Sequence, residues 1–173
     1  MDNIRITSGI FRGRSIASPK SNLTHPMGSR EKLALFNLIS DFLAEATVLD
    51  AYAGSGALGI EALSRGAKTV DFIEKTSKIA QTITNNLNSL NINNARVINI
   101  DVDKFDTTKQ YDIILADPPY DNFRLNSIIR LTKYLKNGGI LVLSHPSSAP
   151  DIPDLKLTKT RKYATANITI YQK

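Results

Sequence analysis

The sequence contains no cysteine and only two histidines, and these absences exclude several kinds of chemistry. Without cysteine there are no disulfides, no thiolate metal sites, and no thiolate nucleophile of the kind that cysteine proteases and some pyrimidine methyltransferases use. His25 and His145 each precede a proline and form no ligand pair, so we expect no metal site. No run of about eighteen apolar residues occurs, and residues 1–19 contain no signal-type apolar segment. We therefore expect a cytoplasmic protein with no membrane partner.

The length and composition are those of an ordinary globular protein. The chain has 173 residues, of which 42% are hydrophobic and 22% are charged. This length suits one domain with a full-sized core. We expect a single domain over residues 1–173, made of a basic N-terminal extension (1–27) and a core (28–173), and a monomer.

Positive charge is concentrated at the two ends of the chain. The formal net charge is +6. Residues 1–32 hold six Lys or Arg against two acidic residues, and residues 156–173 hold five with no acidic residue. The segment between them is slightly acidic. Basic ends around a near-neutral body indicate a polyanionic partner such as nucleic acid, although a lysine-rich surface that only aids solubility has the same composition.

Short apolar segments alternate with amphipathic ones along the middle of the chain. We expect strands at 47–51, 69–73, 96–100, 111–116 and 140–144, and helices from Ser29 (a candidate cap) and at 56–65, 77–90 and 125–135. Gly138 and Gly139 are expected to stop the last helix, and residues 19–26 to form a loop. This alternation predicts a doubly wound α/β fold, a mostly parallel seven-stranded sheet covered on both faces.

Both ends of the chain add extended segments to this pattern. Residues 5–16 alternate loosely around Gly9 and Gly13, which predicts a short extended or hairpin segment. Near the C-terminus, 156–160 and 166–171 are too close for a crossover helix, so they should form an antiparallel hairpin at one edge of the sheet.

A glycine-rich loop follows the first strand of the core. Gly54, Gly56 and Gly59 fit the GxGxxG spacing between a strand and a helix, and Glu74 lies twenty residues beyond Gly54. Glycines let the backbone turn tightly and approach a ligand, and a carboxylate at that distance can accept both ribose hydroxyls. The pattern favours a nucleotide or nucleoside site over a purely structural turn.

Two further carboxylates bear on which ligand this loop binds. Asp50 ends the first strand, where it would repel a pyrophosphate but would suit a cationic ligand such as S-adenosylmethionine (SAM). Asp101 follows the third strand and could face the adenine amino group. A helix cap for the following turn explains Asp101 equally well.

The tetrapeptide Asp117-Pro118-Pro119-Tyr120 follows the apolar strand 111–116. Ligands of such sheets bind outside the carboxyl ends of the strands. The prolines fix the backbone and leave nearby carbonyls free to accept hydrogen bonds. A carboxylate and a fixed carbonyl can orient the lone pair of an aromatic amine toward a methyl donor, while the tyrosine stacks on the base. The tetrapeptide is therefore a candidate catalytic motif, although it could also be a rigid turn.

These motifs together resemble class I SAM-dependent methyltransferases that modify exocyclic amines, and more narrowly the RsmD family of 16S rRNA (guanine-N2)-methyltransferases of the bacterial small subunit. The resemblance spans nearly the whole chain. The segments that carry it are RITSGIFRGR (5–14), HPM (25–27), ALFN (34–37), AGSGALGIEALSRG (53–66) and DPPY (117–120).

The resemblance implies SAM as cofactor, S-adenosylhomocysteine as product, and 16S rRNA, within a partly assembled small subunit, as partner. It implies cofactor binding by Asp50, Ala53, Gly54, Ser55, Gly56, Glu74 and Asp101. The implied catalytic residues are Asp117, Pro118, Pro119 and Tyr120. It also implies that Arg12, Arg14, Arg30 and Lys32 meet the RNA phosphates. From the charge of the C-terminal end we expect Arg161 and Lys162 to bind RNA as well.

Other functions remain open at this point. The tetrapeptide does not separate guanine from DNA adenine or from another RNA amine. Glutamine N-methyltransferases use a similar motif that begins with asparagine. A non-catalytic RNA-binding module with a retained SAM fold is a further alternative, but Gly54, Gly56, Glu74 and Asp117 are all present here. A nicotinamide dehydrogenase is opposed by Asp50 and by the tetrapeptide.

Overall fold

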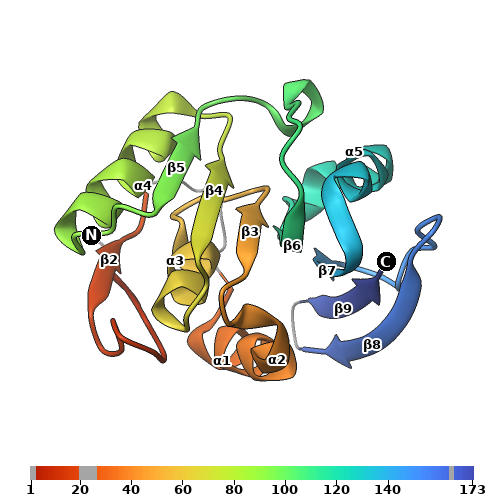
Figure 1. Cartoon of the computed structure of the whole chain (residues 1–173), viewed down its shortest axis with the longest axis horizontal. Coiled ribbons are helices and arrows are strands. Elements are labelled where there is room, and N and C mark those ends of the chain that lie inside the picture. The colour runs from red at the N-terminus through yellow and green to blue at the C-terminus, as the bar shows by residue number, and fades with distance from the viewer. Residues whose placement is uncertain (1–2, 20–26, 164–165) are drawn as a thin grey trace.

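The computed structural model describes residues 3–19, 27–163 and 166–173. It contains a seven-stranded sheet and, beside it, a two-stranded hairpin (Figure 1). The expected loop at 19–26 and the HPM segment at 25–27 fall largely outside the described residues. No helix in the described part of the chain is long and apolar enough to cross a membrane.

The large sheet has the strand order β5-β4-β3-β6-β7-β9-β8. Its strands are β3 (Thr47–Asp50), β4 (Thr69–Ile73), β5 (Ala95–Ile98), β6 (Tyr111–Ala116), β7 (Leu135–His145), β8 (Lys156–Lys162) and β9 (Asn167–Gln172). The first five pair in parallel, and β9 pairs antiparallel with both β7 and β8. The predicted doubly wound, mostly parallel sheet with a C-terminal antiparallel hairpin is therefore confirmed.

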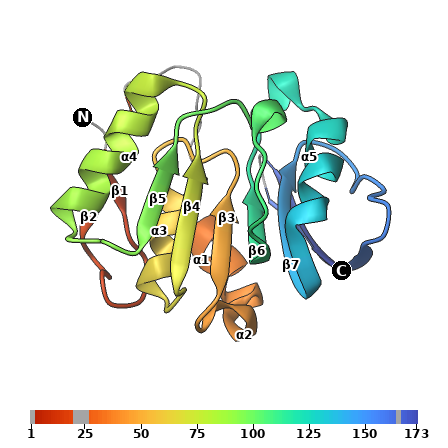
Figure 2. The ribbon, with the colours of Figure 1, turned by 45° about the horizontal axis from the view of Figure 1, so that its top comes forward.

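Helices cover both faces of the sheet, as Figure 2 shows. They are α1 (Ser29–Leu38), α2 (Ser40–Leu43), α3 (Ala57–Ser64), α4 (Ser77–Ser89) and α5 (Leu125–Leu131), with short 3-10 turns η1 (Val102–Lys104), η2 (Tyr120–Asn122) and η3 (Thr132–Tyr134). One core lies between the sheet and α1, α3 and α4, and includes Phe36, Ile60 and Ile83. The other lies between the sheet and α5, and includes Ile128 and Leu131. Burial on both faces explains why the central strands read as short apolar runs.

The segment around Gly138 differs from the prediction. Helix α5 ends at Leu131, and β7 begins at Leu135 and runs through both glycines, where we expected the end of a helix. The pairing of β6 with β7 shifts register here, because Gly138 takes a φ of +78° and lets the strand bulge. The bulge also exchanges backbone hydrogen bonds with Lys173. These glycines thus shape a strand instead of stopping a helix.

The N-terminal segment forms the predicted hairpin from β1 (Asn3–Arg5) and β2 (Ser15–Ala17). Ile6 and Ile16 anchor it in the core beside α3. Its turn packs against the end of α3, where Ile10 N donates to Ser64 O over 2.8 Å. The expected cap at Ser29 is wrong: Gly28 precedes the helix and no side chain caps it.

Candidate functional site

The glycine loop joins β3 to α3 as the spacing predicts. Gly54 and Gly56 have φ values of +53° and +79°, which residues with side chains rarely adopt. A Cβ on Gly54 would meet no atom within 4 Å, so this part of the loop faces open space. A Cβ on Gly59 would lie 2.2 Å from Cε1 of Phe72. Gly54 therefore permits the tight turn beside open space, and Gly59 permits α3 to pack on β4.

Neighbouring contacts hold this loop in place. Ala53 is buried and its N–H donates to Ile73 O over 3.0 Å. Ser55 is also buried, and its carbonyl accepts a 3.1 Å bond from Nδ2 of Asn86. The same amide group exchanges two hydrogen bonds with the backbone of Ala17 in β2. Asn86, which the sequence did not single out, thus links the glycine loop to the N-terminal hairpin.

Asp50 is a buried carboxylate with one oxygen unsatisfied. Its Oδ2 accepts a 2.9 Å bond from the N–H of Gly59, while its Oδ1 has no partner. Burial raises the pKa of Asp50 to about 7, the Gly59 bond opposes that shift, and the charges of Asp117 and Glu74 add to it. An unpaired buried carboxylate next to an open glycine loop is suited to a ligand that carries positive charge.

Glu74 reaches back from the end of β4 to the glycine loop. Its Oε2 accepts a bond of 3.1 Å from the N–H of Gly54, and its Oε1 accepts one of 2.8 Å from the N–H of Thr76. A carboxylate has about four acceptor positions, so two remain for the hydroxyls of a ribose. The structure thus places Glu74 next to Gly54, as the twenty-residue spacing predicts.

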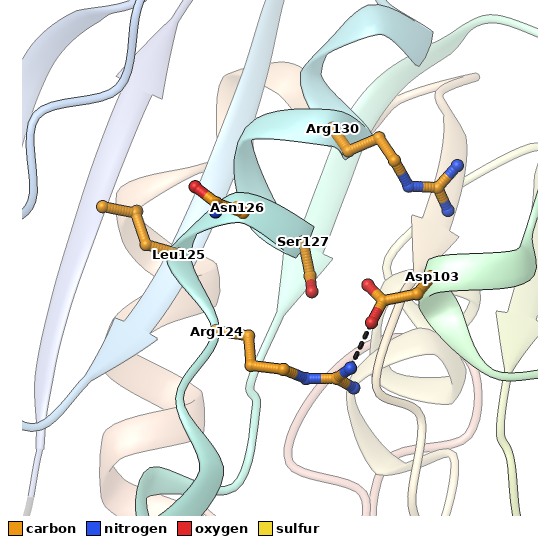
Figure 3. A pocket seen from close by; sticks show the side chains of 6 residues that line it. All are labelled: Asp103, Arg124, Leu125, Asn126, Ser127 and Arg130. Atoms are coloured by element: carbon orange, nitrogen blue, oxygen red, sulfur yellow. Dashed lines mark hydrogen bonds and ion pairs between the residues drawn. The ribbon is translucent and has the colours of Figure 1, made fainter.

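Asp101 follows β5 and caps η1. Its Oδ1 accepts a 2.9 Å bond from the N–H of Asp103, which is the cap that we weighed against an adenine contact. Arg124, just before α5, lies 3.7 Å from Asp101 and also pairs with Asp103. Figure 3 shows Arg124 and Asp103 pointing toward one another. Arg130, also drawn in Figure 3, donates to Phe105 O over 2.9 Å. Arg124 and Arg130 thus both connect α5 to the segment around η1.

An open pocket of about 460 Å³ lies between η1 and the start of α5 (Figure 3). It is lined by Asp103, Arg124, Leu125, Asn126, Ser127 and Arg130. The pocket adjoins Asp101 through the Arg124 ion pair. In the described residues no group of three or more His, Asp or Glu side chains is arranged to hold a metal ion.

The tetrapeptide lies at the end of β6, next to the glycine loop. Strand β6 pairs with β3, with Leu115 opposite Asp50, so Asp117 and the loop after β3 share the carboxyl edge of the sheet. Pro118 is buried, Pro119 is exposed, and Tyr120 is partly buried at the start of η2. Burial raises the pKa of Asp117 to about 6. A carboxyl group with this pKa is ionised at neutral pH and can still accept a proton.

Ser144, at the end of β7, is a residue of this site that sequence reasoning missed. It is 3% exposed, and its hydroxyl hydrogen bonds to the hydroxyl of Tyr120. Its hydroxyl also lowers the pKa of Asp117 against the effect of burial. Ser144 thus acts on both ends of the tetrapeptide. A serine in an apolar strand has no sequence signal of its own, and only the pairing of β6 with β7 brings it here.

The predicted RNA-binding cations do not lie together. Arg12 and Arg14 are exposed in the turn of the hairpin, which packs against the C-terminal end of α3. Arg14 donates to Ser89 O over 2.9 Å, at the C-terminal end of α4. Because α3 and α4 run back from the carboxyl edge of the sheet, this turn lies toward the amino edge (Figure 2). Arg30 is exposed in the first turn of α1.

The prediction that Lys32 contacts RNA phosphates does not agree with its position in the structure. The side chain is 1% exposed, and its ammonium donates to Arg5 O over 2.9 Å and lies 3.5 Å from Glu61. Burial lowers the pKa of Lys32, and the charge of Glu61 opposes that shift. The ammonium group is occupied by the Arg5 carbonyl and Glu61 inside the protein, so it is not exposed to an RNA phosphate. Arg161 and Lys162, in contrast, are exposed on β8.

The chain has the class I methyltransferase fold. This fold combines a sheet of this order with a glycine loop after β3 and, here, an Asp-Pro-Pro-Tyr motif after β6. The chain belongs to the family described as "Conserved hypothetical protein 95", which matches residues 4–172. The relatives below place it in the RsmD/YlbH branch of methyltransferases.

Two relatives and one solved structure illustrate the similarity. "Putative rRNA methyltransferase YlbH" of Bacillus subtilis (strain 168) is 31% identical over 182 residues, covering 98% of this chain and 99% of that protein. "Ribosomal RNA small subunit methyltransferase D" of Escherichia coli (strain K12) is 38% identical over 130 residues, covering 74% of this chain and 66% of that one. The structure "Putative methyltransferase yhhF from Escherichia coli" matches with a TM-score of 0.90 at 29% identity, covering 99% of this chain and 98% of that one.

Proposed function

We propose that the chain is a SAM-dependent methyltransferase that modifies the exocyclic N2 amine of a guanine in 16S rRNA of the small ribosomal subunit. The observation that carries the proposal is the adjacency of Asp50 and Asp117 at the ends of paired strands β3 and β6. This adjacency supports the proposal because it brings the glycine loop beside the Asp-Pro-Pro-Tyr motif. Relatives that are named for ribosomal RNA small subunit methylation support the substrate class.

The residues present fit the cofactor. The unpartnered Oδ1 of Asp50 is available to a cation, Gly54 leaves open space, and Glu74 retains acceptor positions for ribose hydroxyls. When bound, SAM supplies an electrophilic methyl group on a sulfonium. Asp50, Ala53, Gly54, Ser55, Gly56 and Glu74 would hold it, with Asp101 toward the adenine.

The tetrapeptide would position the amine. The Asp117 carboxylate and the backbone carbonyl of Pro118 accept the two N–H bonds of the amino group, which turns its lone pair away from the ring. Tyr120 stacks on the base, and Pro119 stiffens the turn. Held in this way, the nitrogen would be aimed at the methyl group that bound SAM would supply. The nitrogen loses its extra proton to Asp117 or to water. Desolvation strengthens each of these contacts.

The experiment that tests this proposal is methyl transfer from labelled SAM to 16S rRNA, to partly assembled small subunits that lack the mark, and to duplex DNA. We expect label in the RNA or subunit samples, recovered as N2-methylguanosine after digestion. Label found only in DNA would overturn the substrate. Absence of label from all three, with SAM still bound, would favour a non-catalytic RNA-binding module.

A matched pair of variants connects the reaction to the motif. Asp117→Ala should lower turnover by at least about a hundredfold, in the range that general-base and positioning groups contribute, while SAM affinity changes little. Asp121→Ala removes an exposed carboxylate four residues away and serves as control. Equal turnover in the two variants would remove Asp117 from the mechanism.

A further inference from the structure

We infer that strand β8 forms a phosphate-binding surface for the RNA that flanks the target base. This inference rests on the proposed function and adds to it a location for the RNA strand. The surface, called here the β8 surface, consists of Lys159, Arg161 and Lys162.

The β8 surface is exposed and carries charge of one sign. All seven residues of β8 are exposed, and they include Lys156 in addition to the β8 surface but no acidic residue. None of these cations forms an ion pair with a carboxylate in the described part of the chain. Because these cations form no ion pair with a carboxylate, none has to be broken when they bind a phosphate. Their binding also releases the counterions of the nucleic acid.

Strand pairing places the β8 surface at the catalytic edge of the sheet. Strand β9 is antiparallel to both neighbours, so β8 runs in the same direction as β7. Arg161 pairs with Ile168, which pairs with Ser144, and Lys162 lies level with His145 through Asn167. Strands are about 4.8 Å apart, so the Arg161 backbone lies about 10 Å from that of Ser144.

Ser144 in turn touches the tetrapeptide. Because its hydroxyl contacts Tyr120, the β8 surface is about two strands away from the group that would stack on the base. A short stretch of single-stranded RNA covers this distance. The phosphates next to an extruded base would therefore pass over the end of β8.

The other basic end of the chain has a different position. Arg12 and Arg14 lie in the hairpin turn, toward the amino edge of the sheet, and Arg14 already binds the backbone of Ser89. Asp117 follows β6 at the opposite, carboxyl edge of the sheet. If Arg12 and Arg14 bind RNA, they bind a more distant part of it. The cations nearest the tetrapeptide along the β8 side are those of the β8 surface.

Lysines on an edge strand also prevent sheets from pairing edge to edge. That role would be met by cations anywhere along β8. Here the cations gather toward the end that shares the catalytic edge, while Asp151 and Asp154 precede the other end. Arg161 also offers a planar fork that matches phosphate geometry. The distribution favours phosphate binding by this end of the strand.

The test compares Arg161→Gln/Lys162→Gln with Lys68→Gln/Lys133→Gln. Both double variants remove two exposed cations; Lys133 forms a surface ion pair with Asp106 and also lies over the ring of Tyr134. Binding to naked 16S rRNA and to partly assembled subunits is measured across salt concentrations, together with SAM affinity and melting temperature. We expect the β8 variant to bind about tenfold more weakly, with the slope of log affinity against log salt reduced by about 1.4. SAM affinity and melting temperature should stay near wild type in both double variants.

The outcomes separate this inference from the proposed function. If the wild type transfers methyl to rRNA and both double variants bind equally well, the β8 surface is not an RNA contact. If the β8 variant weakens binding to subunits but not to naked rRNA, the surface contacts a ribosomal protein and the inference is overturned. If the wild type neither binds nor methylates RNA, the proposed function is wrong, and the inference about the β8 surface is overturned with it.

Discussion

The ammonium nitrogen of Lys32 lies 3.5 Å from Oε2 of Glu61, and the two side chains are 1% and 0% exposed. This buried ion pair joins α1 to α3. Glu61 also accepts bonds from Thr7 and Arg65. Burial raises the pKa of Glu61, but these partners lower it by more, so the net shift is downward. One carboxylate thus fastens the N-terminal hairpin, α1 and α3 together.

Lys32→Met is expected to destabilise the protein without a direct effect on RNA binding. Removing one partner of a buried pair costs about 3 kcal/mol, at the lower end of the usual range because Glu61 keeps Arg65. The measurement is urea unfolding, with Arg30→Met as an exposed control that should change the unfolding free energy by less than about 0.5 kcal/mol. A folded Lys32→Met protein should retain the wild-type salt dependence of RNA binding. A reduced slope would instead support a phosphate contact for Lys32.

Ser144→Ala is expected to slow methyl transfer and to move its pH dependence. The rate should rise with pH as Asp117 ionises near its pKa of about 6. Without the Ser144 hydroxyl this pKa rises, so the acidic limb of the profile for kcat should move to higher pH. SAM affinity should not change. Ser144→Thr keeps a hydroxyl and should keep the wild-type profile. An unshifted profile in Ser144→Ala would remove Ser144 from the positioning of Asp117.

Asp50→Asn is expected to stabilise the protein while weakening cofactor binding. Burial raises the pKa of Asp50 to about 7, so above that pH the native state holds a buried charge. For a carboxyl group whose pKa is raised on folding, stability falls as pH rises from the unfolded value toward the folded one. The variant should therefore melt about 3 °C above wild type at pH 8, and the gap should shrink at pH 5. SAM affinity should fall at least tenfold, since Asn lacks the charge. A lower melting temperature at pH 8 would contradict this account.

Gly54→Ala and Gly59→Ala should fail in different ways. A Cβ on Gly59 would collide with Phe72, so this variant should lose about 1 to 3 kcal/mol of unfolding free energy. Gly54 has open space but a φ of +53°, which costs a side chain about 1 kcal/mol. Gly54→Ala should lose more SAM affinity than stability. Denaturation and SAM titration of both variants separate the effects, and identical losses would mean that the two glycines share one role.

The sequence predicted the fold because its central strands are short apolar runs between helices. The runs at 69–73 and 111–116 coincide with β4 and β6, since strands buried on both faces leave a continuous apolar signal. The closing hairpin was also predicted, because a connection of a few residues excludes a crossover helix. The segment around Gly138 was mispredicted because paired glycines mark a helix end or a strand bulge equally well.

The sequence by itself determined which chemical groups are present: a glycine loop and four carboxylates at or just after the ends of strands, one of which begins the Asp-Pro-Pro-Tyr motif. Tertiary structure decided which groups meet. It buried Lys32 against Glu61 and brought Ser144 to Tyr120. It also set Arg161 toward the carboxyl edge of the sheet and the hairpin turn toward the amino edge. The physical reason is that spacing reports periodicity along one chain, whereas these contacts depend on which strands pair and which helix faces pack.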